Sequence, residues 1–542
     1  MRSTLLLKVS LLVCVAAIAI HLGGLPLIDT DEGRNAEVAR EMAETNDYVV
    51  PRLNTVPYLD KPIVYFAAQA ALMEVLGPTE LAARLPAYFF TLATAALIFW
   101  FARRRIGEEE AWVAAIAYLA MPLTMAFARV VIFDSTLAFF IAVAIVAFHE
   151  AIELRDRRWT ALAWAAIGFG VLTKGPVAIA VPLLVALPYA IWRKAAPMLW
   201  SVAGLMIFAA VVTPWVWAIS RVVPDFLYYV LVTETVARLT SEEMMRSGPP
   251  WYFLPYFVAG AAPWTVAVVA NWRDWSRRDG RSVFLLLWVL VPLVFFSLSE
   301  SKRAQYILPV MPAVALLVAL SWQTFRPRAA AVAMALFGAV LLVGPSLPQF
   351  SRIKPAALVE PARSASRGYG LVFLAGGAVA LASRDRRTAF LSLALPVVAM
   401  PAIGGPFLYA LSERRSQRSF VAELAPHLSA QTEVIGVEMF TGSLAFYLQR
   451  PIILVTADAS ELTSNYIVRR YQRFSGQPGV PVKPLPWFAQ SLERCCDPRI
   501  YLVRDDDPHH QDHLESRGAR LLATGTHYFA YAYSGPQRRR SP

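Results

Sequence analysis

Charged residues are scarce in this sequence of 542 residues. Only 17% of them are Asp, Glu, Lys or Arg, whereas 57% are hydrophobic. Because a soluble domain carries about a quarter charged residues, the shortage excludes an ordinary soluble protein and indicates one that lies in a bilayer. The net charge of +12 comes from short basic clusters between apolar runs, a pattern that argues against a nucleic-acid-binding face.

Cysteine is also scarce. The chain has three cysteines, Cys14, Cys495 and Cys496, which are too few for a disulfide framework or a four-ligand zinc site. Cys14 falls within an apolar run and is expected to face lipid. The adjacent pair could oxidise, but two free thiols are an equal alternative. Redox chemistry is therefore not expected.

Long apolar runs, in contrast, are abundant. A run at residues 5–25 follows a basic start and precedes no small-residue cleavage signal, so it predicts an uncleaved first span. Twelve further runs bring the expected number of transmembrane helices to about 13. They lie near residues 82–102, 110–127, 131–150, 159–174, 176–192, 198–219, 254–271, 283–298, 304–322, 330–347, 369–382 and 389–410.

Basic residues mark every second loop between these runs. With the N-terminus placed in the cytoplasm, six successive inner loops are rich in Lys and Arg, as the positive-inside rule requires. An odd number of spans then places the C-terminus outside, and the lack of paired cysteines there favours a bacterial periplasm. The inner clusters are Arg103 to Arg105; Arg155, Arg157 and Arg158; Arg193 and Lys194; Arg273, Arg277, Arg278 and Arg281; Arg326 and Arg328; and Arg384, Arg386 and Arg387.

The first outer loop, residues 26–62, combines acids and bases with helical patterning. From Asp29 to Met42 the small and apolar residues recur at helical spacing while the charged residues point elsewhere, which predicts a helix lying on the membrane surface. The next apolar stretch, residues 63–76, is too short to cross and predicts a second interfacial or re-entrant helix. As structural alternatives, Asp31 could favour the helix dipole, and Asp29 or Thr30 could cap the helix.

Other ionisable residues are expected at the same outer level. Asp134 opens an apolar span, where a carboxylate is costly unless it has a function or a partner. Lys174 ends the fifth span, and Arg303 precedes the tenth. Lys174 and Arg303 could instead be snorkelling anchors, and Asp134 could form a purely structural ion pair with Arg129.

Several motifs on this outer side occur in a characteristic order. They are DEGRNAEVAREM from Asp31, VVPRLN from Val49, YLDKP from Tyr58, LTKGP from Leu172 and YILPVMPA from Tyr306. Together they resemble the ArnT family of lipid A aminoarabinose transferases. That family belongs to glycosyltransferase family 83, within the protein mannosyltransferase-like GT-C superfamily.

The resemblance implies a GT-C fold and a defined reaction. A sugar such as 4-amino-4-deoxy-L-arabinose would pass from a polyprenyl (undecaprenyl) phosphate donor to lipid A or another extracytoplasmic acceptor, with inversion. Breaking the glycosyl phosphate bond develops positive charge on the sugar and negative charge on the departing phosphate, so carboxylates and cations respectively would stabilise the transition state.

The resemblance also implies roles for individual residues. Asp31 is expected at the reacting centre, as general base for a hydroxyl acceptor or as an orienting group for an ionised phosphate, and Asp134 would assist it. The expected ligands of the donor phosphate are Arg34, Lys61, Lys174 and Arg303. Substrate contacts are expected from Asp29, Glu32 and Tyr306.

The C-terminal part differs in composition. We expect residues 1–410 to form the transmembrane GT-C domain and residues 411–542 a small soluble α/β domain that caps or steadies the membrane part. Short β-type runs and helical segments alternate there, without a Gly-rich nucleotide loop. His509, His510 and His513, beside Asp505 to Asp507, could bind a metal, but a solvated loop is the favoured interpretation.

Two other functions compete with this interpretation. One is a GT-C transferase that acts on protein or glycan hydroxyls. The other is a transporter of lipid-linked sugars, which would be expected to show internal repeats and ionisable groups near the midplane of the bilayer. No clear repeat is found, and the acids gather on one side. We expect a monomer without nucleic acid or a resident metal, although a divalent ion is compatible with the chemistry.

Overall fold

The computed structural model describes residues 2–230, 248–275, 279–494, 497–533 and 535. Arg277, Arg278, Cys495 and Cys496, all singled out above, lie outside the described residues. Contacts divide the chain into two compact units. We call Met1–Leu22 with Arg84–Ala410 the helical unit, and Gly23–Ala83 with Leu411–Pro542 the mixed unit. The first outer loop thus groups with the C-terminal part, which differs from the boundary expected from sequence.

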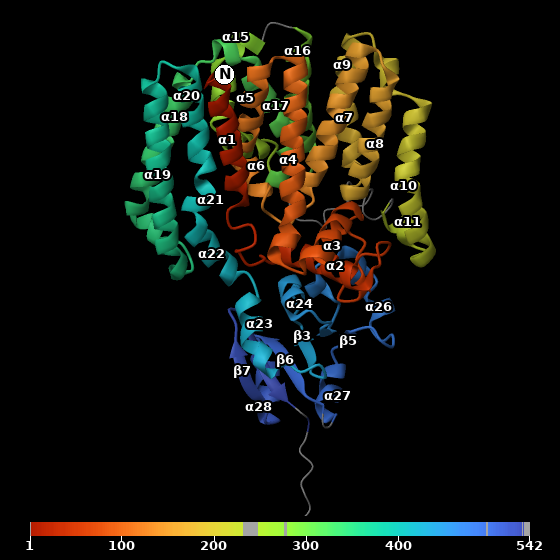
Figure 1. Ribbon diagram of the computed structural model, residues 1–542. Helices are drawn as coiled ribbons and strands as arrows, with labels where there is room; N and C mark the ends of the chain where they lie inside the picture. Colours follow the sequence, from red (N-terminus) through yellow and green to blue (C-terminus); the bar gives the residue numbers. More distant parts are fainter. Residues whose placement is uncertain (1, 231–247, 276–278, 495–496, 534, 536–542) are drawn as a thin grey trace, which may run out of the picture. The chain divides into compact units, whose positions relative to one another are not determined.

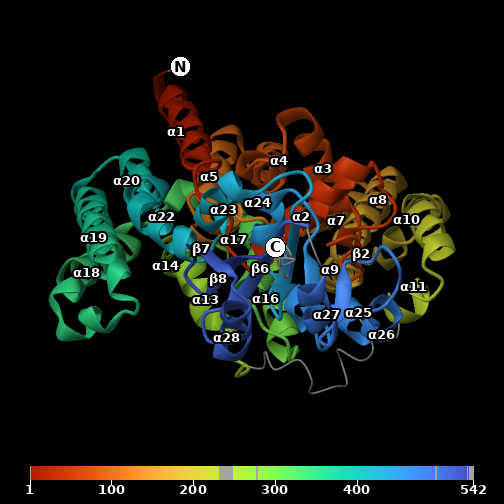
Figure 2. The ribbon, with the colours of Figure 1, turned by 90° about the horizontal axis from the view of Figure 1, so that it is seen from below.

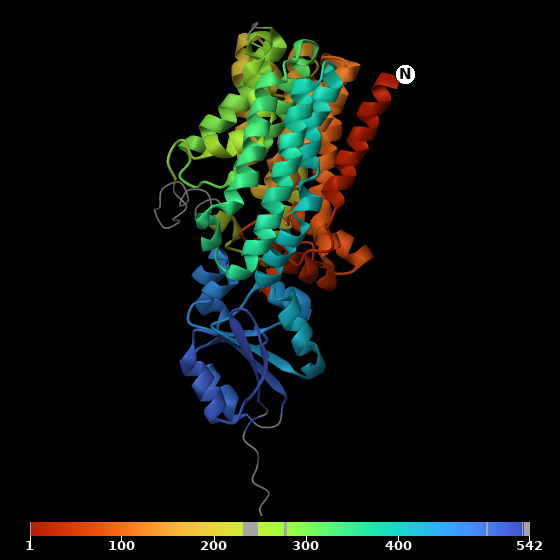
Figure 3. The same cartoon turned by 90° about the vertical axis from the view of Figure 1, so that its left-hand side faces the viewer.

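The helical unit consists of helices that run alongside one another (Figure 1, Figure 3). α4 starts in the mixed unit and α22 ends there. The larger helices are α1 (Arg2–Ala19), α4 (Glu80–Arg105), α5 (Glu108–Leu119), α6 (Pro122–Phe127), α7 (Asp134–Leu154), α8 (Arg157–Lys174), α9 (Val177–Trp192), α10 (Val202–Val222), α13 (Phe253–Gly260), α14 (Trp264–Ala270), α16 (Gly280–Leu298), α17 (Met311–Leu320), α18 (Arg328–Val343), α19 (Val359–Ala382), α20 (Arg386–Val398) and α22 (Gly405–Arg414). Short helices connect them, namely η1 (Ala196–Leu199), α11 (Phe226–Tyr228), α15 (Trp272–Trp275), η3 (Ala304–Val310), η4 (Trp322–Thr324), η5 (Gly344–Ser346), η6 (Pro348–Arg352), η7 (Ala356–Leu358) and α21 (Met400–Ile403).

Among the described residues, seven helices are long and apolar enough to cross a membrane, or eight if the bent pair α13 and α14 is one span. The expected multi-span architecture is therefore present, whereas the count of thirteen is not confirmed. Several of the predicted runs form helices too short for this criterion, including Val177–Trp192 and Ala304–Leu320. The run at residues 110–127 is divided between α5 and α6, where Pro122 begins the second helix, a position that proline favours.

Helices of the helical unit pack on one another in pairs. α7 packs on α8, α8 on α10, and α18 on α19. Small residues bring the last pair close, since a Cβ at Gly338 or Gly370 would overlap with backbone atoms of the facing helix. Close approach through small residues is typical of helix packing in membranes.

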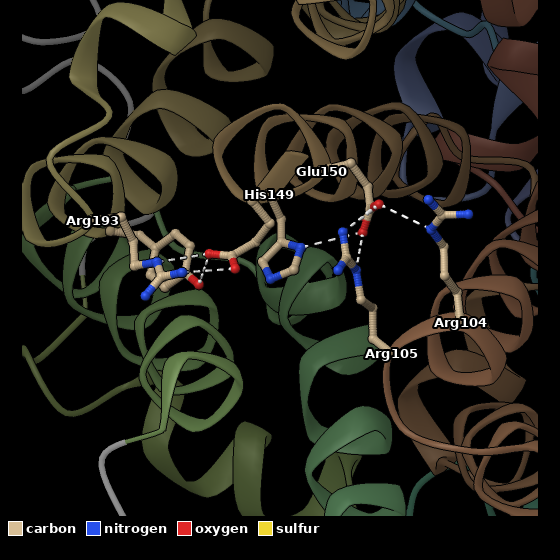
Figure 4. Close-up of polar contacts among 7 residues, drawn as sticks. Arg104, Arg105, His149, Glu150 and Arg193 are labelled. Carbon is tan, nitrogen blue, oxygen red and sulfur yellow. Dashed lines mark hydrogen bonds and ion pairs between the residues drawn. The ribbon is translucent and has the colours of Figure 1, made fainter. Parts of the chain in front are cut away.

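Basic residues from the predicted inner loops pair with acids of α7 in the helical unit (Figure 4). Arg105 Nε and Nη2 each donate to the Glu150 carboxylate at 2.6 Å, and Arg104 Nε donates at 3.2 Å. Glu150 is fully buried. Arg193 makes a comparable pair with Glu153 at 2.8 Å. These pairs tie α4 and α9 to α7, so the arginines have a structural role in addition to the topological role expected from sequence.

The mixed unit begins with the first outer loop. It contains α2 (Asp31–Thr45), a short hairpin of β1 (Arg52–Leu53) and β2 (Val56–Pro57), and α3 (Val64–Leu76). The two helices match those predicted. α2 packs on α3 and on α24 (Gly442–Leu448) of the C-terminal part, and these contacts place the loop in the mixed unit.

α2 differs in one respect from the surface helix expected for this segment. The sequence pattern implies that its charged residues face away from the apolar side into a polar environment. Glu37, Arg40 and Glu41 are instead buried, because neighbouring elements cover several faces of the helix. Arg40 pairs with Glu37 at 2.7 Å. The Glu41 carboxylate accepts hydrogen bonds from the backbone N–H groups of the β1–β2 turn.

The C-terminal part of the mixed unit contains a six-stranded sheet with strand order β5-β4-β3-β6-β8-β7. Its strands β6, β7 and β8 are labelled in Figure 2. The strands are β3 (Glu433–Val437), β4 (Ile453–Thr456), β5 (Val482–Pro484), β6 (Arg499–Arg504), β7 (Arg520–Thr524) and β8 (Tyr528–Tyr533). β3, β4, β5 and β6 are parallel, and β8 joins β6 antiparallel. The accompanying helices are α23 (Arg418–Leu424), η8 (Ala425–His427), α24, η9 (Ser460–Leu462), α25 (Asn465–Arg469), α26 (Tyr471–Phe474), α27 (Trp487–Glu493) and α28 (Pro508–Ser516). This is the small α/β fold predicted from the sequence.

Candidate active site

In the helical unit, three of the predicted residues lie together. Asp134 begins α7 and is buried, Lys174 ends α8, and Tyr306 lies in η3. Lys174 Nζ donates to Asp134 Oδ1 at 2.5 Å and lies 4.6 Å from the centroid of the Tyr306 ring. α7 packs against both α8 and η3, so the helix packing itself brings the three side chains into contact.

The Lys174 ammonium is thus held by a carboxylate and by an aromatic face. The side chain of Lys174 is 16% exposed and that of Asp134 is 4% exposed. A buried carboxylate needs such a partner because its desolvation is costly. The sequence alternative for Asp134 was an ion pair with Arg129, and the ion pair found in the structure is with Lys174. Arg129 Nη2 donates to the backbone oxygen of Ile20.

Arg303 precedes η3, close in sequence to Tyr306. Burial and the neighbouring Tyr256 raise the pKa of Tyr252, which comes just before α13, and the charge of Arg303 acts against this rise. The neighbouring Lys302 is buried and donates to the backbone oxygens of Ser297 and Ser299 at 2.8 and 2.7 Å. Lys302 therefore stabilises the loop between α16 and η3, which carries Arg303.

In the mixed unit, Asp31 and Arg34 form an ion pair on the first turn of α2. Arg34 Nη2 lies 2.7 Å from Asp31 Oδ1. Burial would lower the pKa of Arg34, but the nearby Tyr58, Asp31 and Asp60 outweigh it and raise the pKa. Arg34 therefore stays cationic. Its guanidinium carbon also lies 5.7 Å from the centroid of the Tyr58 ring.

Asp29 lies in the turn that leads into α2. One of its carboxylate oxygens accepts the backbone N–H of Ser443 at 2.9 Å, and the other accepts the Ser443 hydroxyl. Burial raises the pKa of Asp29 to about 6, although the hydrogen bonds from Ser443 and Thr441 act in the opposite direction. The adjacent acid Glu32 is buried, and its Oε2 accepts the backbone N–H of Ile28 at 3.0 Å.

Lys61 follows Asp60 before α3. Its Nζ donates to the backbone oxygen of Asp60 at 2.6 Å. The Asp60 carboxylate accepts the backbone N–H groups of Asn465 and Tyr466 at 3.0 and 3.1 Å. Asp60 thus accepts hydrogen bonds from the first backbone N–H groups of α25, which holds the backbone beside Lys61 in place.

A separate group in the mixed unit has the composition of a metal site. Among the described residues, ligand atoms of Glu438, Asp507 and His510 lie within 4.8 Å of one another. His510 Nδ1 lies 2.6 Å from Asp507 Oδ2. The histidine and the aspartate belong to the cluster noted in the sequence, but Glu438 follows β3. Because β3 and β6 are parallel neighbours, their carboxyl ends bring the three residues together.

Comparison with known proteins shows what this chain is similar to. A family model described as dolichyl-phosphate-mannose-protein mannosyltransferase matches residues 60–217. A relative from Yersinia enterocolitica, named undecaprenyl phosphate-alpha-4-amino-4-deoxy-L-arabinose arabinosyl transferase, is 32% identical over 300 residues, which are 53% of this chain and 54% of the relative. A protein of the same name from Pectobacterium atrosepticum is 27% identical over 484 residues, covering 85% of this chain and 87% of the relative.

The match to a solved structure extends over the whole chain. The crystal structure of ArnT from Cupriavidus metallidurans bound to undecaprenyl phosphate has a TM-score of 0.86 with 26% sequence identity, and the match covers 99% of both chains. The chain is ArnT-like. In sequence, the ArnT-like chain spans about half the length of the Yersinia relative, whereas in structure both of its units are matched. The GT-C fold predicted from the motifs is thereby confirmed.

The predicted site residues of the ArnT-like chain fall in both units. The mixed unit contains Asp29, Asp31, Glu32, Arg34 and Lys61, and the helical unit contains Asp134, Lys174, Arg303 and Tyr306. The roles of these residues stay predictions. The sequence analysis missed three residues that contact them. Ser443 donates to Asp29, Thr463 accepts hydrogen bonds from Arg34 Nη1, and the backbone oxygen of Asp60 accepts one from Lys61. Asp60 lies within the YLDKP motif and could have been noted there, whereas no local pattern marks Ser443 or Thr463.

Proposed function

We propose that the chain is a membrane glycosyltransferase that transfers a sugar from undecaprenyl phosphate to lipid A or another extracytoplasmic acceptor, with inversion. The observation that carries this proposal is the match of the whole chain to ArnT bound to undecaprenyl phosphate. The names of the curated relatives support 4-amino-4-deoxy-L-arabinose as the sugar.

In the proposed reaction, Asp31 lies beside the anomeric carbon, where positive charge develops. Its carboxylate would accept a proton from a hydroxyl acceptor, or would orient an acceptor phosphate that is already ionised. The ion pair with Arg34 fixes the direction of the Asp31 carboxylate. In this proposal Asp134 assists the reaction, and Glu32 and Tyr306 contribute to substrate binding.

The cations are assigned to the donor phosphate. Arg34 is suited to bidentate contact with a phosphate, and Lys61 and Lys174 act as point charges. Arg303 is the fourth member of this set. The negative charge on the phosphate grows as the glycosyl bond breaks, so cations held in place before the reaction stabilise the transition state more than the ground state.

The proposed setting is a bacterial inner membrane, with the N-terminus in the cytoplasm and the mixed unit in the periplasm. The basic ends of α4, α7 and α9 support this orientation, because Arg105, Arg155 and Arg193 lie at the same end of neighbouring helices. The undecaprenyl donor would lie in the outer leaflet, and we propose that one copy of the chain is sufficient.

The test is sugar transfer by the purified protein in detergent. With radiolabelled undecaprenyl-phosphate aminoarabinose and lipid A, we expect labelled lipid A. A lipid-linked-sugar transporter would yield no covalent product, and label on a peptide or glycan acceptor alone would identify a hydroxyl-directed transferase. Mass spectrometry should find the same sugar on lipid A from the host that carries the gene and should not find it when the gene is removed.

A further inference from the structure

The turn that carries Asp31 and Arg34 is held by residues from a distant part of the sequence, within the mixed unit. Arg34 and Thr463 are 429 positions apart, and Asp29 and Ser443 are 414 positions apart. Both contacts are hydrogen bonds, so they fix direction as well as distance.

The guanidinium of Arg34 is oriented from two sides. Its Nη2 donates to Asp31 Oδ1 at 2.7 Å, and its Nη1 donates to both the backbone oxygen and the hydroxyl oxygen of Thr463 at 2.9 Å. Because a guanidinium is planar and rigid, bonds to two of its nitrogens set the plane of the whole group. Thr463 thus determines how Arg34 faces a bound anion and, through Arg34, how Asp31 is held.

The start of α24 holds Asp29, which lies just before the first turn of α2. Ser443 donates its backbone N–H and its hydroxyl to the two oxygens of Asp29. The backbones also touch, since a Cβ at Gly33 would overlap with the Ser443 nitrogen, and a Cβ at Gly442 would overlap with the Arg34 nitrogen. Glycine at both positions permits this approach, so a small displacement of α24 would displace Arg34.

We propose that Thr463 and Ser443 are positioning residues for the Asp31–Arg34 pair, so that the C-terminal part of the chain completes the site. This inference rests on the proposed function for its kinetic consequences. It gives Asp29 the role of an anchor for the turn, in place of the substrate contact suggested by the sequence. It also gives the C-terminal part a direct role in the reaction, beyond capping.

The kinetic test compares Thr463→Val, which removes the hydroxyl acceptor while keeping the side-chain shape, with Thr463→Ser, which restores it. Loss of one hydrogen bond to a charged group is expected to lower kcat by about tenfold, with a smaller change in KM for the donor, because the phosphate charge grows in the transition state. Thr463→Ser should recover most of the rate. Thr524→Val, at an exposed threonine of β7, is the matched control and should keep the wild-type kcat.

Ser443→Ala is compared with Ser491→Ala. Both serines are fully buried in the mixed unit, but Ser491 lies in α27 and donates to the backbone oxygen of Phe488 at 2.6 Å. We expect Ser443→Ala alone to lower kcat per folded molecule. If both serine variants lose only melting temperature and keep kcat, the role of Ser443 is structural and the positioning role is refuted.

A second measurement, the chemical modification of Arg34, does not depend on transferase activity. The rate at which phenylglyoxal modifies Arg34, followed by peptide mass spectrometry, should rise severalfold in Thr463→Val and Ser443→Ala and return in Thr463→Ser. Unchanged modification together with unchanged kcat overturns the inference. If the wild-type protein transfers no sugar while the modification rates respond as expected, the proposed function fails and the positioning of Arg34 stands.

Discussion

Lys174 Nζ and Asp134 Oδ1 lie 2.5 Å apart, at the end of one helix and the start of another. Lys174 was a candidate phosphate ligand and Asp134 a candidate carboxylate of the reacting centre. Their pairing means that a donor phosphate which binds Lys174 has to share it with Asp134. A phosphate bound at Lys174 would therefore reduce the positive charge that Lys174 offers to Asp134.

The first prediction concerns this pair. Lys174→Met should lower the melting temperature markedly, because it leaves Asp134 as an uncompensated buried charge, a defect that costs about 3–5 kcal/mol. Adding Asp134→Asn should restore most of the stability, since the charge is then removed. Both variants should have little transferase activity. A double variant that is no more stable than Lys174→Met would show that the ion pair does not matter for folding.

The second prediction concerns Asp31. Asp31→Asn keeps the shape of the side chain and removes the charge at the proposed reacting centre. The loss of one preorganised electrostatic contact should lower kcat by roughly 100- to 1000-fold without unfolding the protein. Asp512→Asn, at an exposed position of α28, serves as the control. Activity of the Asp31 variant within threefold of wild type would remove Asp31 from the reacting centre.

The third prediction separates binding from chemistry at Lys61. Lys61→Ala should raise KM for the undecaprenyl-phosphate sugar and also lower kcat, because the charge of the leaving phosphate increases in the transition state. Lys61→Arg should keep part of the activity, since the positive charge remains. Steady-state kinetics at saturating donor distinguish the two effects. Wild-type values for Lys61→Ala would leave Lys61 as an interfacial anchor only.

The fourth prediction concerns pH and Asp29. Burial raises the pKa of Asp29 from 3.8 to about 6, so the folded state binds the proton more tightly than the unfolded state. The stabilisation from this proton is complete below pH 4 and is lost as the pH rises towards about 6. The melting temperature of the wild type relative to Asp29→Asn should therefore fall between pH 4 and about 7 and then level off. A difference that is constant over this range would contradict the shifted pKa.

The fifth prediction concerns topology. A reporter phosphatase fused after the C-terminus should be active, because this enzyme requires the periplasm and the basic loops place the C-terminus there. A fluorescent reporter that matures only in the cytoplasm should stay dark at the same position. The opposite pattern would invert the orientation of the whole chain and move Asp31 to the cytoplasmic side.

Some of the candidate site could be predicted from local sequence alone. The Asp31–Arg34 ion pair joins positions three apart on a helix, and such pairs follow from helix geometry. The helix at Asp31–Thr45 and the short helix at Val64–Leu76 likewise follow from the spacing and length of the apolar residues. The family resemblance rests on contiguous motifs, the first of which lies in α2, and the structural match confirms it.

The burial of Glu37, Arg40 and Glu41 could not be predicted in this way. Helical spacing shows which residues share a face, but not what covers that face. Three elements, α3, α24 and β1, pack on α2. None of them is part of the helix, so the spacing of residues within α2 does not reveal them. The same reason explains why Asp134 pairs with Lys174, forty positions away. Sequence proximity alone indicates Arg129 as a partner.

Composition and apolar runs by themselves determined that this is a polytopic helical membrane protein with a small α/β part. The hydrophobicity and the periodicity of a segment are local properties that can be read from consecutive residues. Only the tertiary structure decided that the first outer loop groups with the C-terminal part and that Ser443 and Thr463 hold its charged turn. Those contacts join residues more than 400 positions apart. A hydrogen bond between such residues depends on how whole elements pack, which no local pattern encodes.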